Sequence, residues 1–249
     1  MNNSIGKIVV DDMEVVTISN VKSPQKHIIF LHGGGYKFPL AKFHTDFGEE
    51  LMKGIDATMY FPVLPLIPDN IFKDAYQKVL VLYNELLENV SSENITIMGD
   101  SSGGGIALGL CQFLVENNIS QPKNIILISP WLDITLKNPA IEKLERLDQV
   151  LDRTWLKEMG SLWAGNQDLD CYQLSPINGK LEALGNLMMI VGSDEIFLPD
   201  TQRLRDRLIE MNVEFDYYEY KGMPHDFPLF QSPEAKEVSE IIKKKINTL

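Results

Sequence analysis

Apolar residues along the chain follow two alternating periods. Short apolar runs, typical of buried strands and bounded by glycine or proline, are separated by segments whose apolar residues recur at helical spacing. After the N-terminal region, the predicted strands cover residues 27–31, 57–61, 94–98, 124–129, 186–192 and 214–220. The predicted helices cover residues 70–90, 105–118, 141–146, 152–164, 200–211 and 234–247. This alternation predicts an α/β fold in which a mostly parallel sheet of about eight strands carries helices on both faces.

The N-terminal region has a different pattern. Apolar and polar residues alternate one by one over Lys7 to Val10 and over Glu14 to Ser19, with Asp11 and Asp12 between the two runs. Alternation with a period of two, interrupted by turn-forming residues, is typical of an antiparallel hairpin. We therefore expect the sheet to begin with a hairpin.

One connection in the alternating pattern is unusually long. Between the predicted strands 124–129 and 186–192, the chain has far more residues than one crossover helix requires. We interpret residues 134–180 as a small insertion that caps the sheet. Because no linker, repeat or low-complexity tract interrupts the pattern, residues 1–249 are predicted to form a single domain with this insertion.

Composition and charge narrow the class of partner. The 249 residues are 44% hydrophobic, which is ample for a sizeable core, and 35 acidic against 23 basic residues give a net charge of −12. Such a surface repels nucleic-acid phosphates and anionic lipid headgroups, so we expect neither partner. No apolar run is long enough for a membrane span.

The cysteines and the N-terminus indicate a cytoplasmic protein. Cys111 and Cys171 are the only cysteines, too few for a disulfide framework, and no Cys/His spacing resembles a zinc site. Residues 1–20 lack the basic start and continuous apolar stretch of a signal peptide. A reducing cytoplasm is therefore the expected location.

A glycine-rich turn follows the predicted strand 94–98. Residues 99–103 read G-x-S-x-G, with Ser101 at the centre, between an apolar strand and an apolar helix. A serine hydroxyl is a weak nucleophile, so it must be held on an exposed, tight turn within reach of a base. Such a turn also suits phosphate binding at a helix N-terminus. The glycine and lysine patterns of nucleotide-binding loops are missing, however, so a nucleophilic Ser101 is the preferred interpretation.

A second glycine-rich segment follows the first buried strand. Residues 32–36 read HGGGY. Acyl transfer places negative charge on a carbonyl oxygen, and backbone N–H groups already in position stabilise that charge without reorienting. Glycine allows close approach because it has no Cβ. We therefore predict an oxyanion loop here, acting together with the N–H of Ser102.

With these two motifs the sequence resembles the hormone-sensitive-lipase-like branch of the α/β-hydrolase fold, which includes bacterial carboxylesterases and acetyl esterases. The matching segments occur in the family's order from residue 28 to the C-terminus. They are HGGGY (32–36), FPVLPLIP (61–68), GDSSGG (99–104), SPWLD (129–133), SPI (175–177), GSDEI (192–196) and GMPHDF (222–227). The resemblance implies a serine carboxylic-ester hydrolase that forms an acyl-enzyme and needs neither a metal nor an organic cofactor.

The resemblance also implies roles for individual residues. Ser101 takes the place of the nucleophile, and the backbone N–H groups of Gly34, Gly35 and Ser102 take the place of the oxyanion donors. Which two of the three loop glycines donate is open by one position. The imidazole of His32 is usually structural in this family and orients the loop.

The base and its acid are expected in the C-terminal third of the chain. Chain order in this fold is nucleophile, acid, histidine, and of the four histidines only His225 follows the last predicted strand, in a loop resembling the family's histidine loop. Asp194 is predicted as the acid because it follows the preceding strand. Glu195 should point to the other side if the chain is still extended there. Asp200 is the alternative acid, although an N-cap role explains it equally well.

The sequence departs from its relatives in two places. Only 31 residues precede the oxyanion motif, so the N-terminal segment that usually covers the active site is missing and the cap must be small. The family's acidic residue in the proline-rich segment is Leu66 here, which puts any contact of that acid in doubt. An apolar stripe in the insertion either covers the acyl pocket or packs as an ordinary helix; it consists of Trp155, Leu156, Met159, Leu162 and Trp163.

These features predict a small-molecule acyl ester as the substrate, with small or short-chain acyl groups preferred over long-chain triglycerides. Two other interpretations stay open at this point. One is an amide or peptide hydrolase of the same fold, although peptidases of this fold usually carry a further large domain. The other is a ligand-binding homologue without catalysis. A homodimer is also open as the oligomeric state.

Overall fold

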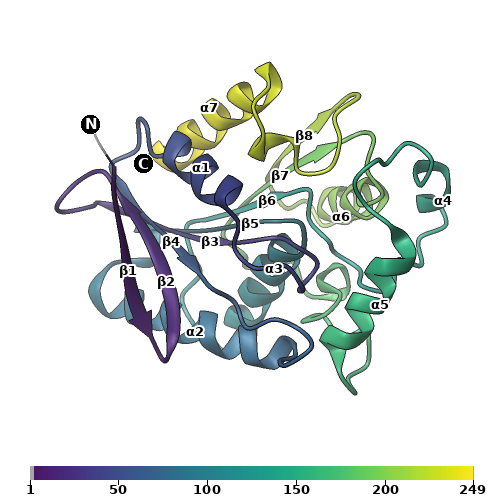
Figure 1. Cartoon of the computed structure of the whole chain (residues 1–249), viewed down its shortest axis with the longest axis horizontal. Helices are drawn as coiled ribbons and strands as arrows, with labels where there is room; N and C mark the ends of the chain where they lie inside the picture. The colour runs from purple at the N-terminus through teal and green to yellow at the C-terminus, as the bar shows by residue number, and fades with distance from the viewer. Residues whose placement is uncertain (1–2, 249) are drawn as a thin grey trace.

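The computed structural model describes residues 3–248 and shows the predicted alternation of strands and helices (Figure 1). The strands are β1 (Ser4–Val10), β2 (Met13–Ser19), β3 (Lys26–Leu31), β4 (Ala57–Pro62), β5 (Ile95–Asp100), β6 (Asn124–Ile128), β7 (Asn186–Gly192) and β8 (Phe215–Tyr220). The helices are α1 (Lys42–Leu51), α2 (Phe72–Asn89), α3 (Ser101–Glu116), α4 (Ile141–Leu144), α5 (Arg153–Ala164), α6 (Leu198–Glu210) and α7 (Pro233–Asn247).

All eight strands belong to one sheet in the order β1-β2-β4-β3-β5-β6-β7-β8. The predicted N-terminal hairpin is confirmed: β1 pairs antiparallel with β2, and the turn residues Asp11 and Asp12 have positive φ values of 46° and 60°. The strand β2 pairs antiparallel with β4, and every later pair is parallel. A mostly parallel sheet of eight strands is therefore confirmed.

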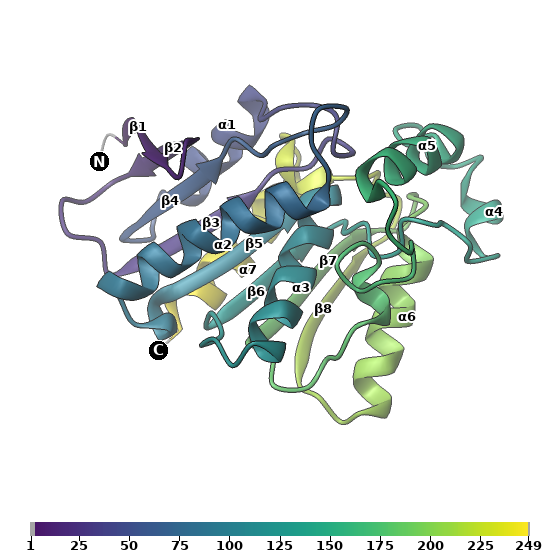
Figure 2. The same cartoon turned by 90° about the horizontal axis from the view of Figure 1, so that it is seen from below.

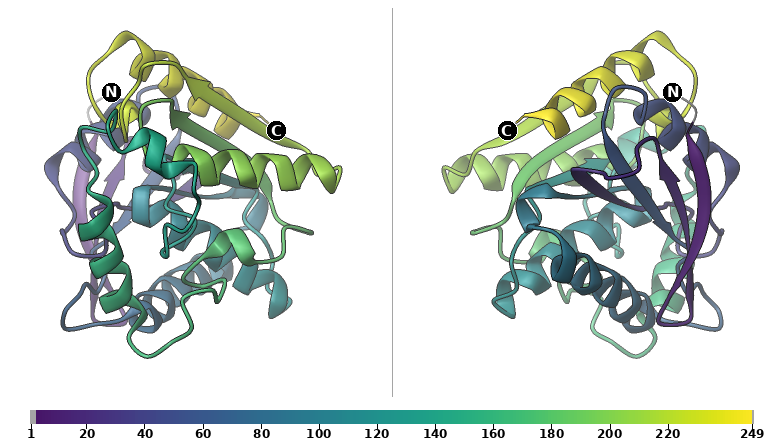
Figure 3. Two further views of the ribbon diagram at one scale, coloured as in Figure 1. Left: turned by 90° about the vertical axis from the view of Figure 1, so that its right-hand side faces the viewer. Right: turned by 90° about the vertical axis from the view of Figure 1, so that its left-hand side faces the viewer.

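Helices cover both faces of the sheet (Figures 2 and 3). Each face has its own apolar core. Along β3, Ile29 and Leu31 face the core shared with α2, α3 and α6, whereas Ile28 and Phe30 face the core shared with α1 and α7. Both faces of a parallel strand are buried, so its sequence is a continuous apolar run rather than an alternating one. The helix α1 was not predicted from the sequence.

The long connection between β6 and β7 lies beyond one end of the sheet (Figure 2). It contains α4, α5 and a 3-10 turn, Pro176–Asn178. We call residues 134–180 the cap segment. Among the described residues, no helix combines the length and the apolar character that crossing a bilayer requires.

Candidate active site

Four segments with chemically active residues meet at one edge of the sheet. In a parallel sheet the carboxyl ends of all strands lie at the same edge, and ligands bind outside those ends. The oxyanion loop follows β3, and Ser101 follows β5. The segment GSDEI begins at the last residue of β7, and the loop with His225 follows β8. The topology therefore brings together residues that are far apart in the sequence.

Ser101 lies on a tight turn from β5 into α3. Its φ of 51° is in the left-handed region, and its side chain is only 4% exposed. The helix begins at Ser101 itself, four residues before the predicted start, because the glycines that follow let the first turn lie against β3. A Cβ on Gly103 would lie 1.9 Å from the carbonyl oxygen of Leu31. Glycine at this position thus permits the close packing of helix and strand.

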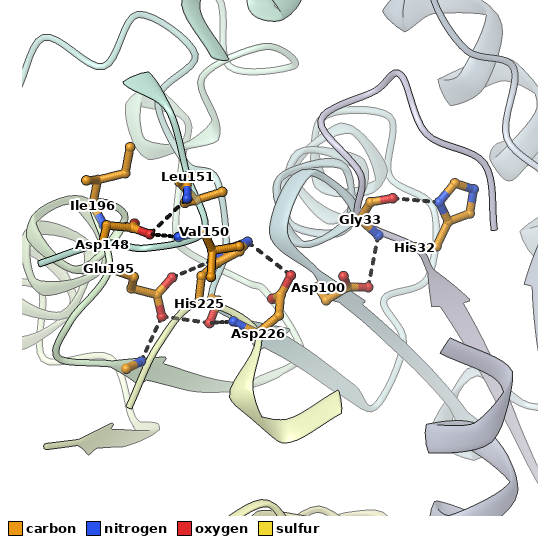
Figure 4. Close-up of polar contacts among 12 residues, drawn as sticks. His32, Gly33, Asp100, Asp148, Val150, Leu151, Glu195, Ile196, His225 and Asp226 are labelled. Atoms are coloured by element: carbon orange, nitrogen blue, oxygen red, sulfur yellow. Dashed lines mark hydrogen bonds and ion pairs between the residues drawn. The ribbon is translucent and has the colours of Figure 1, made fainter. Parts of the chain in front are cut away.

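The oxyanion loop is tied to this turn by a buried carboxylate that sequence reasoning missed. The backbone N–H of Gly33 donates to Asp100 Oδ1 at 2.9 Å, and Asp100 is 1% exposed (Figure 4). The imidazole of His44 lies on the other carboxylate oxygen, with Nε2 3.5 Å from Oδ2. Asp100 therefore holds the loop beside Ser101.

The hydrogen bond of Gly33 bears on the choice among the loop glycines. Within residues 3–248, no hydrogen bond from the N–H of Gly34 or Gly35 is found, whereas the N–H of Gly33 is already bonded to Asp100. Both glycines have positive φ, 114° and 61°. A Cβ on Gly35 would lie 2.7 Å from the ring of Trp155 in the cap segment. Only glycine fits under this indole.

The side chain of His32 contacts the backbone of the oxyanion loop. Its Nδ1 lies 2.8 Å from the carbonyl oxygen of Gly33, and the side chain is buried. Burial lowers the pKa of His32 to about 4, so the imidazole is neutral at physiological pH. A neutral, buried imidazole bonded to the loop backbone fits the structural role that the resemblance implies.

The partner of His225 is Glu195, and the prediction of Asp194 at this position is wrong. Glu195 Oε2 lies 2.6 Å from His225 Nδ1 (Figure 4). Its other oxygen accepts hydrogen bonds from Ser129 Oγ at 2.7 Å and from the N–H of Gly192 at 2.8 Å. Glu195 is fully buried. These three contacts fix the orientation of the carboxylate. Because Oε2 accepts a hydrogen from Nδ1, they also select the imidazole tautomer that carries its hydrogen on Nδ1.

Asp194 lies on the other side of the turn. Its Oδ1 accepts a hydrogen bond from Ser193 Oγ at 2.6 Å, and its N–H donates to the carbonyl oxygen of Met223. The prediction assumed an extended chain through this segment, but β7 ends at Gly192 and a turn begins with Ser193. The turn reverses the expected alternation and directs Glu195 into the site.

The second ring nitrogen of His225 contacts a further carboxylate. Its Nε2 lies 3.0 Å from Oδ2 of Asp226, the next residue in the chain. No hydrogen bond joins Ser101 Oγ to His225 in the described part of the chain. Burial lowers the pKa of the imidazole, but Asp226 and Glu195 outweigh this effect and raise the pKa of His225 well above its usual range. Both nitrogens of His225 thus face carboxylates.

Asp200, the alternative acid, belongs to a different contact. It lies in the first turn of α6 and accepts a hydrogen bond from Asn138 of the cap segment at 2.9 Å. Burial raises its pKa to about 6.

Across the described residues, no cluster of three or more His, Cys, Asp or Glu has an arrangement suited to a metal ion.

The cap segment is joined to the site by an aromatic column. Tyr36 of the oxyanion loop stacks between Trp163 and Trp131 at centroid distances of 4.5 and 5.1 Å. Trp131 stacks on Phe197, and the Phe197 ring meets His225 edge-on at 5.2 Å. The cap therefore packs against the oxyanion loop and, through this column, against the histidine loop.

The apolar stripe of the cap segment was predicted either to cover the acyl pocket or to pack as an ordinary helix, and its members differ in this respect. Leu156, Met159 and Trp163 are buried in the core, whereas Leu162 is 45% exposed. The ring of Trp155 stacks on Phe38 and covers Gly35. Core packing therefore explains three members of the stripe, and Trp155 alone lies over the oxyanion loop.

The cap segment also reaches the turn that carries Glu195. Asp148 Oδ1 accepts hydrogen bonds from the N–H groups of Val150 and Leu151, and Oδ2 accepts one from Ile196. All three distances are 2.9 Å (Figure 4). Asp148 thus fastens the cap to the residue next to Glu195.

Comparisons with known proteins agree with this arrangement. A family described as having the alpha/beta hydrolase fold matches residues 28–229. The chain is 28% identical to an esterase of Acinetobacter venetianus over 84% of its own length and 71% of that protein. A crystal structure of a putative esterase from Staphylococcus aureus covers the whole chain, which covers 85% of it, with 29% identity and a TM-score of 0.96.

A further solved structure bears on the branch of the fold. A hormone-sensitive lipase from a metagenome library covers 98% of the chain, which covers 85% of it, at 26% identity and a TM-score of 0.92. The predicted resemblance to the hormone-sensitive-lipase-like esterases is confirmed.

Proposed function

The chain belongs to the alpha/beta-hydrolase-fold family that matches residues 28–229, and from this premise we propose that it is a serine carboxylic-ester hydrolase. The proposed triad is Ser101, His225 and Glu195, with oxyanion donors on Gly34, Gly35 and Ser102. The contact that supports it most is the 2.6 Å hydrogen bond between Glu195 and His225 at the strand edge that carries Ser101. The names of similar proteins, esterases and lipases, support ester chemistry.

The proposed reaction proceeds through an acyl-enzyme. Ser101 Oγ attacks the ester carbonyl while Nε2 of His225 takes its proton, and the negative oxygen rests on the N–H groups of the loop and of Ser102. The C–O bond to the alcohol then breaks, and His225 returns the proton to the departing alcohol. Water attacks the acyl group by the same route and releases the acid and Ser101. Glu195 stabilises the imidazolium without taking its proton.

We further propose that the substrates carry small acyl groups. Ser101 and His225 are only 4% and 5% exposed, and aromatic rings of the cap and the oxyanion loop close around them. Trp155 lies directly over Gly35, where the acyl carbonyl must sit to reach its donors. An indole in this position leaves little length for an acyl chain.

The acyl-chain preference can be measured with a series of p-nitrophenyl esters from acetate to dodecanoate. We expect the highest kcat/KM at the short end, with a decrease of about tenfold or more toward the longest esters, since each misplaced methylene costs roughly 1 to 3 kcal/mol. Trp155→Ala, which opens the space over Gly35, should move the maximum toward longer chains. A maximum at long chains in the unaltered protein would overturn the proposal.

Covalent labelling tests the nucleophile directly. A fluorophosphonate probe should form a phosphorus–oxygen bond with Ser101 Oγ and release fluoride, because the turn, base and oxyanion donors activate this hydroxyl. Mass spectrometry should find the added mass on the peptide that contains Ser101, and heat-denatured protein should stay unlabelled. Absence of label would favour a ligand-binding homologue, and label on another serine would refute the assignment.

Amide or peptide hydrolysis is the rival within the same chemistry. The residues that form the acyl-enzyme do not distinguish an ester from an amide. Nothing in the described residues favours peptides, and the names of two similar proteins, an esterase and a lipase, favour esters. Ester hydrolysis is therefore the function that we propose.

A further inference from the structure

Asp226 contacts His225 in a position that the proposed reaction cycle does not explain. In that cycle Nε2 exchanges protons with Ser101 and with the leaving alcohol, so it needs a free lone pair at the start. In the structure Nε2 lies 3.0 Å from Asp226 Oδ2 instead. The Nδ1 side of the ring is already occupied by Glu195 at 2.6 Å.

The contact between Nε2 and Asp226 requires a proton. Glu195 accepts the hydrogen on Nδ1, so a neutral imidazole directs its lone pair from Nε2 at Asp226, and two lone pairs repel at this distance. The contact is attractive only when Nε2 or Oδ2 carries a hydrogen. In either form the lone pair of Nε2 is unavailable to Ser101.

The backbone of the loop holds Asp226 in this position. Its φ of 53° is left-handed, and its N–H donates to Ser129 Oγ at 3.1 Å, the same hydroxyl that donates to Glu195. The other carboxylate oxygen, Oδ1, is buried without a hydrogen-bond partner in the described residues. A carboxylate with one unsatisfied oxygen is held against the base by its loop.

Other charged groups around the pair of His225 and Asp226 also favour a proton on this pair. Glu195 faces His225 from the turn after β7, and Asp100 faces Asp226 from the end of β5. Phe197, directly before α6, contributes an uncharged ring that is nearly perpendicular to the imidazole. Within residues 3–248, the charged groups that act on the imidazole are the carboxylates of Asp226 and Glu195, so it keeps its proton more firmly than a free histidine does.

We infer that Asp226 is a positioning residue that holds the resting imidazole of His225 in its protonated form, so that the base is released for Ser101 only when the pair loses its proton. This inference rests on the proposed role of His225 as the base. It predicts that ester hydrolysis begins at a higher pH than the range of about 6 to 7 in which an unperturbed histidine titrates.

Two substitutions of Asp226 test this inference. Asp226→Asn keeps the shape and tolerates the left-handed backbone, and Asp226→Gly removes the side chain while accepting the same φ. In both variants we expect the acid limb of the kcat/KM profile to move down by about one pH unit, with about a tenfold higher rate on that limb. The control is Asp56→Asn, an exposed carboxylate before β4 at the opposite edge of the sheet, which should leave the limb in place. An unmoved limb in both Asp226 variants would overturn the inference.

An NMR titration separates this inference from the proposed function. The imidazole proton resonance of His225, assigned by its loss in His225→Asn, can be followed with pH in Ser101→Ala protein, where no turnover is needed. We expect its midpoint to lie above the ordinary range and to fall when Asp226→Asn is added. If Asp226→Asn lowered the midpoint but the unaltered protein hydrolysed no ester, the inference would be retained and the proposed function refuted. Turnover with an unmoved midpoint would do the reverse.

Discussion

Ser101→Ala is expected to abolish measurable turnover of p-nitrophenyl esters, with a loss in kcat of at least about 10³-fold. The substitution removes only the hydroxyl oxygen that forms the acyl-enzyme, so the remaining rate would come from the oxyanion donors and substrate binding alone. Because alanine keeps the Cβ and leaves the close packing of the neighbouring glycines unchanged, the fold should persist. Initial rates at saturating ester, with circular dichroism to verify folding, provide the measurement.

A matched serine elsewhere provides the control for this loss. Ser161 is exposed on α5, and its hydroxyl donates only to the carbonyl oxygen of Lys157 in the same helix. Ser161→Ala should therefore hydrolyse the esters at the original rate. If Ser101→Ala hydrolysed the esters at a rate similar to that of Ser161→Ala, a different group would attack the ester.

The fold could be predicted from the sequence because its strands and helices have distinct periods. The buried runs around Ile28 and Ile126 are apolar throughout, and both belong to central parallel strands. The helix α1 escaped prediction because it is short and buries few apolar residues, chiefly Phe47 and Leu51. Helices whose stability depends on tertiary contacts leave a weak periodic signal.

Within the candidate site, motifs located the segments but not every side chain. The glycine-rich turn and the histidine loop led to Ser101 and His225, which the topology brings to one edge of the sheet. The predicted strand 186–192 ends where β7 ends, but choosing between Asp194 and Glu195 also required the conformation of the turn that begins at Ser193. The contact of Asp226 with Nε2 depends on the left-handed backbone of Asp226 in a loop. A loop conformation produces no periodic pattern in the sequence, so this contact could not be predicted.

Glu195→Gln is expected to reduce kcat by about 10³- to 10⁴-fold, whereas Asp194→Asn should stay within a few-fold of the unaltered protein. A glutamine keeps the size of the side chain but lacks the charge that stabilises the imidazolium in the transition state. A loss of 10⁴-fold corresponds to about 5 kcal/mol in activation free energy. Single-turnover and steady-state rates with one short ester would measure the pair of variants side by side.

The stability of Glu195→Gln needs its own measurement, because Oε1 also accepts hydrogen bonds from Ser129 and from the N–H of Gly192. A glutamine that turns its amide nitrogen toward Gly192 places two donors together and destabilises the turn. Thermal unfolding distinguishes this effect from a loss of catalysis. Glu195→Asp is the second variant, since it keeps the charge but is one methylene shorter, and it should retain more activity than the glutamine. If Asp194→Asn lost activity while Glu195→Gln kept it, the carboxylate that orients His225 during turnover would be Asp194, and the resting contact of Glu195 would have no catalytic role.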